Sequence, residues 1–430
     1  MTLENFETKR GHLFISGVDT CALAEKYGTP LYVMSEDIIR KNCKSLKETF
    51  EKYYDSKGLI TYASKAFCCK EMCRIIADEG LGLDVVSGGE LYTAHEAGFP
   101  MGKINFHGNN KTDEEIELGI QLGVGRFVID NISELRRVND AAKKHNVIQN
   151  VLIRITPGVE AHTHEFIKTG QIDSKFGAAI QTGAADEICD YAMTLSNISL
   201  EGFHCHIGSQ IFEANPFIET AEIMLKFIKD TEKRLNTEFS ELVLGGGFGI
   251  KYVDSDEPLE PGEILKDVLI YIKDKLLGEN KKLIKLGFEP GRSIAGPAGI
   301  TLYKVGSVKE IPGIRTYVSV DGGMTDNPRY ILYGAEYRAL IASKADDKKD
   351  KLVTIAGKCC ESGDIVAKDV YLGDVKEGDI LSVFATGAYN YSMASNYNRI
   401  PKPAVVMVKN GSSRVIIERE SFKDMCRRDF

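Results

Sequence analysis

The sequence predicts an α/β plus all-β protein, in which a (β/α)8 TIM-type barrel is followed by a C-terminal β domain. Three observations lead to this prediction. The chain has 430 residues, more than one ordinary domain needs. Its middle part alternates short β-type runs with amphipathic helical segments, and its last third holds β-type runs with little helix between them. Eight β-then-α units fit a barrel of about 250 residues, and an open doubly wound sheet is the alternative.

The barrel prediction depends on eight runs rich in Val, Ile, Leu and Phe. They are residues 59–64, 82–86, 103–107, 126–130, 151–156, 200–206, 242–245 and 284–289. One helix between them illustrates the pattern. Asn215 is the expected cap, Pro216 is the expected first helical residue, and apolar side chains from Phe217 to Ile228 follow at 3.6-residue spacing.

The second domain is predicted from the change of pattern after Gly296. Strands are expected at residues 316–320, 351–356, 366–372, 379–384, 404–408 and 413–418. Asn410-Gly411 between the last two is typical of a hairpin turn. Residues 12–16 also read as a strand. The predicted domains are therefore an N-terminal segment 1–34 that joins the β domain, a barrel over 35–295, and the β domain over 296–430.

Composition limits the partners and the compartment. The formal net charge of −8 disfavours nucleic acid and anionic lipid as partners. The N-terminus lacks the apolar core of a signal peptide, and no apolar stretch is long enough to cross a bilayer, so we expect a cytoplasmic protein with no membrane partner. The ten cysteines show no paired C-x-x-C spacing, so we expect reduced thiols and no structural metal.

Lys65 stands at the end of the first barrel run, among the small residues Ala63, Ser64 and Ala66. A barrel places its strand ends at the catalytic face. A lysine at that face can form a Schiff base with a carbonyl cofactor. For Lys65 considered alone, a solvated surface charge is the alternative.

Other polar features also fall at strand ends. Asp84 lies at the second run, Gly245-Gly246-Gly247 follow the seventh, and Glu289-Pro290-Gly291-Arg292 follow the eighth. Glycines let backbone N–H groups close on a phosphate, and barrels commonly bind phosphate after strands seven and eight. A tight turn is the alternative for the glycines. His204 and His206 share one strand face, but no carboxylate motif completes a metal site. We expect His206 to stack on a flat ring, and a merely buried histidine is the alternative.

Together these motifs resemble the fold-type III pyridoxal-phosphate decarboxylases, which pair an alanine-racemase-like barrel with a β domain. Within that group the closest likeness is to the diaminopimelate decarboxylase family. The likeness runs over nearly the whole chain. It rests on Tyr62-Ala-Ser-Lys, Val86-Ser-Gly-Gly-Glu-Leu, Phe106-His-Gly-Asn-Asn-Lys, His206-Ile-Gly-Ser-Gln, Gly245-Gly-Gly, Glu289-Pro-Gly-Arg and Gly387-Ala-Tyr.

The resemblance implies a cofactor, pyridoxal 5'-phosphate, and a role for each residue near it. Lys65 would be the Schiff-base lysine, His206 would stack on the ring, and Glu289 would pair with the pyridinium nitrogen. The other expected cofactor-binding residues are Asp84, Ser209, Gly245, Gly246, Gly247, Gly291, Arg292 and Tyr389.

The resemblance also implies a small amino-acid substrate with a charged far end. In that family the arginines matching Arg292 and Arg329 bind this end together with the residue matching Tyr333, and a guanidinium can grip a carboxylate with two hydrogen bonds. Tyr389 is expected beside them. Residues 164–177 look like the family's substrate segment, and Glu361 is the expected partner of a distal ammonium.

The implied reaction is decarboxylation of meso-2,6-diaminopimelate to L-lysine and CO2, the last step of bacterial-type lysine biosynthesis. Cys360 is the expected proton donor, and His206 and Lys65 are the other expected catalytic residues. In this family the cysteine loop crosses to the neighbouring subunit, which implies a homodimer with shared active sites. The alternatives are a decarboxylase of the same fold acting on ornithine, arginine or carboxynorspermidine, and a non-catalytic homologue that binds the cofactor.

Overall fold

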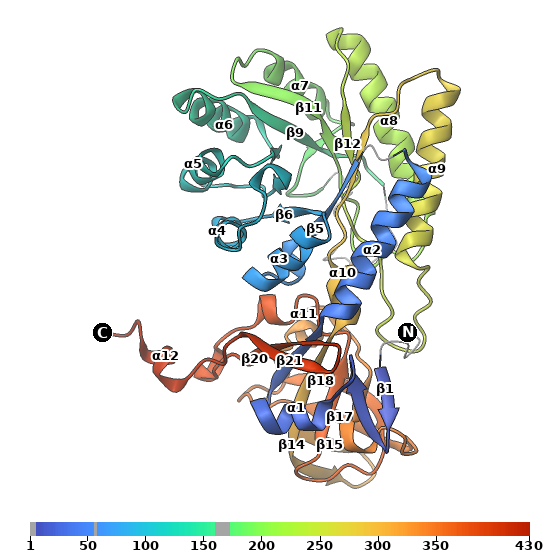
Figure 1. Ribbon diagram of the computed structural model, residues 1–430, viewed down its shortest axis with the longest axis vertical. Helices are drawn as coiled ribbons and strands as arrows, with labels where there is room; N and C mark the ends of the chain where they lie inside the picture. Colours follow the sequence, from blue (N-terminus) through green and yellow to red (C-terminus); the bar gives the residue numbers. More distant parts are fainter. Residues whose placement is uncertain (1–5, 56–57, 160–172) are drawn as a thin grey trace. The chain divides into compact units, whose positions relative to one another are not determined.

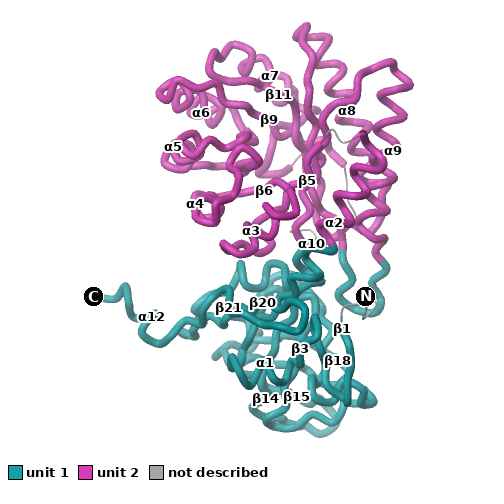
Figure 2. Tube along the Cα trace, in the orientation of Figure 1, with its two compact units in different colours: residues 1–41, 250–257, 294–430 teal, residues 42–249, 258–293 magenta. Residues whose placement is uncertain are grey.

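The computed structural model describes residues 6–55, 58–159 and 173–430. The chain forms two compact units (Figure 2). The first, which we call the β unit, contains residues 1–41, 250–257 and 294–430. The second, the barrel unit, contains residues 42–249 and 258–293.

The barrel unit is built on eight parallel strands (Figure 1). They are β5 (Gly58–Ala63), β6 (Gly82–Val85), β7 (Ile104–Phe106), β8 (Arg126–Ile129), β9 (Gln149–Thr156), β11 (Ile198–His204), β12 (Glu241–Val243) and β13 (Lys285–Phe288). Each strand pairs with the next, and β13 pairs back with β5, which closes the ring. The predicted barrel is therefore confirmed. An open doubly wound sheet is excluded, because an open sheet has two unpaired edge strands, whereas here β5 and β13 pair with each other.

Helices follow most of these strands. They are α3 (Lys70–Asp78), α4 (Gly88–Glu96), α5 (Asp113–Leu122), α6 (Ile132–Lys144), α7 (Ala184–Met193), α8 (Asn215–Leu235) and α9 (Pro261–Gly278). Helix α2 (Glu36–Tyr53) precedes β5. A two-residue strand, β10 (Ala178–Ala179), extends the sheet beside β9. No helix in the described ranges is long and apolar enough to span a membrane.

Helix α8 buries the face that its sequence predicts, including Phe217, Met224 and Ile228. Its start is one residue earlier than we predicted. The Ile218 N–H donates to the Ala214 carbonyl, so Ala214 is the cap and Asn215 is the first helical residue. Pro216 fits the second helical position as well as the first, because neither position needs an intrahelical N–H donor.

The β unit contains a nine-stranded sheet. Its strands are β4 (Leu31–Ser35), β14 (Gly299–Ile311), β15 (Arg315–Val320), β16 (Ala339–Ile341), β17 (Lys351–Ala356), β18 (Ile365–Leu372), β19 (Ile380–Phe384), β20 (Ala404–Lys409) and β21 (Ser412–Ile417). The hairpin predicted at Asn410-Gly411 joins β20 and β21 in antiparallel pairing. Strands β4, β14 and β16 of this sheet were not predicted. Strand β4 is buried at all five positions and so carries no alternation of polar and apolar residues.

Strand β4 occupies a central position in this sheet, antiparallel to β14 and parallel to β20. The β unit also includes a small sheet of β1 (Phe6–Lys9), β2 (His12–Ile15) and β3 (Val18–Asp19), followed by α1 (Thr20–Tyr27). One hydrophobic cluster contains residues from both ends of the chain, including Leu13, Val33, Leu302 and Val406. The two ends of the chain therefore share one core.

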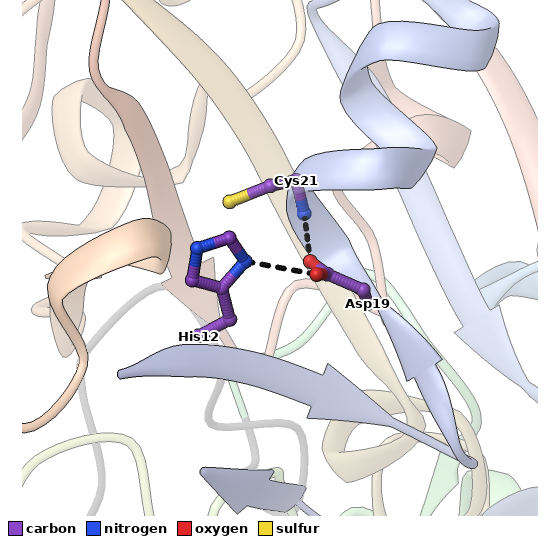
Figure 3. Close-up of side chains that lie close together, drawn as sticks. All are labelled: His12, Asp19 and Cys21. Atoms are coloured by element: carbon purple, nitrogen blue, oxygen red, sulfur yellow. Dashed lines mark hydrogen bonds and ion pairs between the residues drawn. The ribbon is translucent and has the colours of Figure 1, made fainter. Parts of the chain in front are cut away.

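Three polar side chains, those of His12, Asp19 and Cys21, lie close together where β2, β3 and α1 meet (Figure 3). The Asp19 carboxylate accepts 2.8 Å hydrogen bonds from the Cys21 backbone N–H and from His12 Nδ1. The first bond caps α1, and the second ties the helix start to β2. Burial, followed by the charges of Asp19 and Asp379, raises the pKa of the Cys21 thiol to about 11. The thiol is therefore protonated at neutral pH. We assign a structural role to His12, Asp19 and Cys21.

Replacing Asp19 tests this capping role. Asp19→Ala removes the acceptor of the Cys21 N–H and should lower the free energy of unfolding by about 1 kcal/mol, measured as a shift of the urea midpoint. Asp19→Asn keeps a capping oxygen and is the matched control. Equal destabilisation by the two variants would contradict the capping role.

Candidate active site

A buried carboxylate, that of Glu289, lies between two histidines at the carboxyl ends of the barrel strands. Its Oε1 is 3.1 Å from His107 Nε2, and its Oε2 is 2.9 Å from His204 Nε2. The same His107 nitrogen is 2.8 Å from Asp84 Oδ1. These side chains come from the ends of β6, β7, β11 and β13, so the closure of the barrel brings them together.

The charges within this group oppose one another. Burial would lower the pKa of His107, but Asp84 and Glu289 outweigh it and raise that pKa to about 9. Burial lowers the pKa of His204 to about 4, so this ring is neutral at pH 7. Burial would raise the pKa of Glu289, yet His204 and His107 hold it well below its ordinary value. Glu289 is therefore an ionised carboxylate.

Asp84 differs from Glu289 in its protonation. Burial, and next the charge of Glu289, raise the pKa of Asp84 to about 7. Asp84 and Glu289 therefore both contact the His107 imidazolium. Glu289, which also contacts His204, is the carboxylate that keeps its charge.

Lys65 follows β5 in a single 3-10 turn (Ser64–Ala66), and its side chain is exposed while its neighbours Ser64 and Ala66 are buried. Its ammonium acts electrostatically on Asp84, Glu90 and His206. The turn itself is held through Ser64, whose Oγ lies 2.8 Å from Glu90 Oε2. Lys65 thus belongs to the same end of the barrel as the Glu289 group.

His206 is half-buried and lies just beyond β11. Its Nδ1 accepts a 3.3 Å hydrogen bond from the Gly246 N–H, which requires that nitrogen to be unprotonated. Burial, and then the charge of Lys65, lower the pKa of His206 well below its ordinary value. The ring is therefore neutral and flat, as a stacking partner should be.

The three glycines after β12 are required by close backbone approaches. A Cβ at Gly246 would lie 2.0 Å from the Glu289 carbonyl oxygen, and one at Gly247 would lie 2.4 Å from the Gly208 oxygen. Gly245 has φ +67° and would meet Cys205 O at 2.7 Å. The turn therefore brings its backbone against both the His206 loop and the Glu289 strand.

Two further predicted residues contact each other in this unit. The Arg292 guanidinium donates a 2.9 Å hydrogen bond from Nη2 to Ser209 Oγ. Gly291 packs against Ala63, whose Cβ would lie 3.0 Å from a Cβ at that position. Gly291, after β13, is thus adjacent to the end of β5 that precedes Lys65, and Ser209, after β11, is linked to the same segment through Arg292.

A second group lies in the β unit around Arg329, the first residue of α11 (Arg329–Tyr333). The buried guanidinium donates a 2.7 Å hydrogen bond to the Tyr337 hydroxyl. It also lies 5.0 Å from the ring centre of Tyr252 and 5.9 Å from that of Tyr389. We call Arg329, Tyr252, Tyr337 and Tyr389 the tyrosine cluster. Tyr333, at the other end of α11, is half-buried.

Cys360 and Glu361 are exposed on the loop after β17 and lie outside the tyrosine cluster. The Cys360 N–H donates a 2.8 Å bond to Asn398 Oδ1. Asp364 orders the same loop by accepting from the Met324 and Cys359 N–H groups at 2.6 and 2.7 Å. Of the expected substrate segment 164–177, residues 164–172 lie outside the described residues.

Several residues of these groups had no predicted role. His107 stands in Phe106-His-Gly-Asn-Asn-Lys, and its place after the third strand was a usable signal. Tyr252 carried no signal, because it belongs to a distant segment that only the fold brings to Arg329. Tyr337 follows Arg329 by eight residues, but no motif marked it.

Residues 36–296 match the family model described as pyridoxal-dependent decarboxylase, pyridoxal binding domain. The chain belongs to the pyridoxal-dependent decarboxylases. It is 48% identical to the diaminopimelate decarboxylase of Bacillus subtilis over 98% of this chain and 96% of the relative. The Bacillus methanolicus enzyme of the same name is also 48% identical, over 96% of both chains.

A solved structure extends this likeness. Diaminopimelate decarboxylase from M. jannaschii in co-complex with L-lysine is 38% identical, with a TM-score of 0.92 over 99% of this chain and 98% of that one. The predicted family and its pyridoxal phosphate cofactor are therefore confirmed. The residues present suit this cofactor, because an ionised buried carboxylate can hold a protonated ring nitrogen and a carboxylate accepts more hydrogen bonds than the two histidines supply.

The raised pKa of His107 can be tested by removing one of its two anionic partners. Asp84→Asn should lower the pKa of His107 from about 9 by roughly one unit or more, because the imidazolium loses an adjacent carboxylate. An NMR titration of labelled histidine measures the change. Asp113→Asn, at an exposed carboxylate, is the control. An unchanged His107 pKa in Asp84→Asn would refute the assignment.

Proposed function

We propose that this chain converts meso-2,6-diaminopimelate to L-lysine and CO2, the closing step of lysine biosynthesis in bacteria. The nearly full-length likeness to enzymes with this name carries the assignment, and one of the similar structures contains L-lysine. The local chemistry agrees with it, because Glu289 is a buried, ionised partner suited to a ring that must accept electrons.

When bound, pyridoxal phosphate supplies the electron sink that lets a carbon–carboxylate bond break. In the proposed site Lys65 would hold it covalently, Glu289 would accept a hydrogen bond from its ring nitrogen, and the neutral His206 ring would stack on it. The glycine turn and Ser209 would bind its phosphate through N–H and O–H donors. The remaining proposed cofactor contacts are Asp84, Gly291, Arg292 and Tyr389.

The substrate's far end is assigned to Arg329, Arg292, Tyr333, Tyr389 and Glu361. In the tyrosine cluster the Arg329 guanidinium lies over the Tyr252 and Tyr389 rings and donates from Nη1 to the Tyr337 hydroxyl, and its edge carries further N–H donors. A carboxylate fits that edge with two hydrogen bonds. Glu361 then provides an anion for the adjacent ammonium.

We also propose that the enzyme is a homodimer with shared active sites. Cys360 is exposed on its loop, so its thiol is available to a second subunit. In this arrangement Cys360 donates a proton to the carbon that CO2 has left. The ten free cysteines suit the reducing cytoplasm, where we propose the enzyme works, and the net charge of −8 argues against nucleic acid as a partner.

Comparing substrates tests the proposed reaction. Purified protein with pyridoxal phosphate should release CO2 from meso-diaminopimelate with a kcat/KM about 100-fold or more above that for ornithine, arginine or lysine, because only the first fills both charged positions of the far end. Arg329→Gln should reduce this preference by raising KM. Activity confined to ornithine or arginine would replace the substrate assignment, and activity on none of the four would favour a non-catalytic homologue.

Covalent attachment is a separate test. After borohydride reduction and denaturation, the wild-type chain should retain cofactor absorbance and Lys65→Ala should not, because the amine is missing. Lys70→Ala, five residues along the chain and also exposed, should retain it. Retention in Lys65→Ala would place the attachment elsewhere.

A further inference from the structure

Lys111, in the loop between β7 and α5, is a lysine buried in the barrel unit, with 1% of its surface exposed. Its Nζ donates to the carbonyl oxygens of Gly108 and Val128 at 2.9 and 2.8 Å, and to Glu134 Oε1 at 2.5 Å. An ammonium has three N–H donors. All three are therefore used inside the protein.

Its partner Glu134, in the first turn of α6, is equally enclosed. Its second oxygen, Oε2, accepts a 3.1 Å bond from the Asp130 N–H at the end of β8. Burial works against both charges, lowering the pKa of Lys111 and raising that of Glu134, while each partner's charge opposes the shift. Desolvating two charges makes a buried ion pair weak evidence for stability alone. The function of this ion pair is therefore better judged from the part of the chain that it holds in place.

The pair fixes the turn that carries His107. Gly108 has φ +122°, and a Cβ there would lie 3.4 Å from the Val86 carbonyl oxygen. The His107 N–H is bonded to Val85 O at 2.8 Å, which ties its start to β6. On its other side the chain is held by the Lys111 bond to Gly108 O, and through Lys111 to β8 and α6. His107 is thus attached to the barrel on both sides, with its ring between Asp84 and Glu289.

We propose that the Lys111–Glu134 pair is a positioning device for the active site, which holds the His107 ring in place against the Glu289 carboxylate. This proposal rests on the proposed function. Lys111 is a positioning residue in it, and Glu289 is the group that meets the cofactor.

A purely stabilising role is the competing interpretation, and the barrel provides a matched control. Arg126 and Glu241 are the first residues of β8 and β12, and thus stand at the opposite ends of the strands. Their Nε–Oε2 distance is 2.7 Å, and both side chains are mostly buried. Arg126→Met therefore removes the shorter of the two ion pairs of Glu241, which also lies 3.4 Å from Lys285 Nζ, without touching the His107 turn.

The experiment compares the holoenzymes of wild type, Lys111→Met, Lys111→Met/Glu134→Gln and Arg126→Met. The double variant removes the unpaired buried charge that could prevent Lys111→Met from folding. Both Lys111 variants should lose about 100-fold in kcat with little change in KM, since displacement of a reacting group by about 1 Å has this scale of effect. Arg126→Met should keep the wild-type kcat.

The pH profile of kcat provides a readout that a stabilising role would not change. Glu289 faces His107 and His204. It also interacts electrostatically with Asp84, Arg154, Cys205 and His206, and Lys65 acts on Asp84 and His206. If His107 moves away, the pKa of Glu289 rises, so the acid limb of kcat should move up by about one pH unit in both Lys111 variants. In Arg126→Met the limb should stay in place.

Two results would overturn the proposal. One is a wild-type kcat and pH profile in either Lys111 variant. The other is an equal loss of kcat in Arg126→Met. A wild-type enzyme that releases no CO2 from meso-diaminopimelate would instead contradict the proposed function, so the two failures are distinguishable.

Discussion

The placement of one ionised carboxylate, Glu289, between two imidazoles organises the catalytic end of the barrel. A buried carboxylate without partners would take up a proton, because burial disfavours its charge. Here the charged His107 and the neutral His204 both contact it, so it remains an anion. The other residues at this end are arranged around that anion. Asp84 shares His107 with it, and the glycine turn passes within contact of its backbone.

This arrangement depends on the closure of the barrel. Glu289 follows β13 and Lys65 follows β5, more than 200 residues earlier, and these two strands are neighbours only because the ring closes. Parallel pairing in register then puts both side chains at the same end of the sheet. An open sheet with the same eight strands would place β5 and β13 in different surroundings. The site therefore forms only when the barrel closes. This is why its polar residues stand at the ends of successive strands.

Much of this could be predicted from the sequence, and the omissions have physical reasons. The eight barrel strands were recognisable because strands buried on both faces are continuous apolar runs ending in polar residues. Strand β4 is equally apolar, but it precedes the helical alternation and pairs with strands that lie far along the chain. Within the site, Glu289 and Lys65 stood in recognisable motifs. The charge state of His107 depends on distances to two carboxylates, and Tyr252 reaches Arg329 only through the fold, so no local pattern indicated either. Tyr337 follows Arg329 by eight residues, and no motif marked it.

The position of β4 has a consequence for how the chain is made. A ribosome delivers Leu31–Ser35 early, yet its neighbours β14 and β20 are complete only after residues 311 and 409. Meanwhile every strand of the barrel has been synthesised, and domains generally fold as units during synthesis. The wholly buried segment Leu31–Ser35 must therefore wait, unpaired, through most of translation, and it is the part of the nascent chain with most need of protection from aggregation.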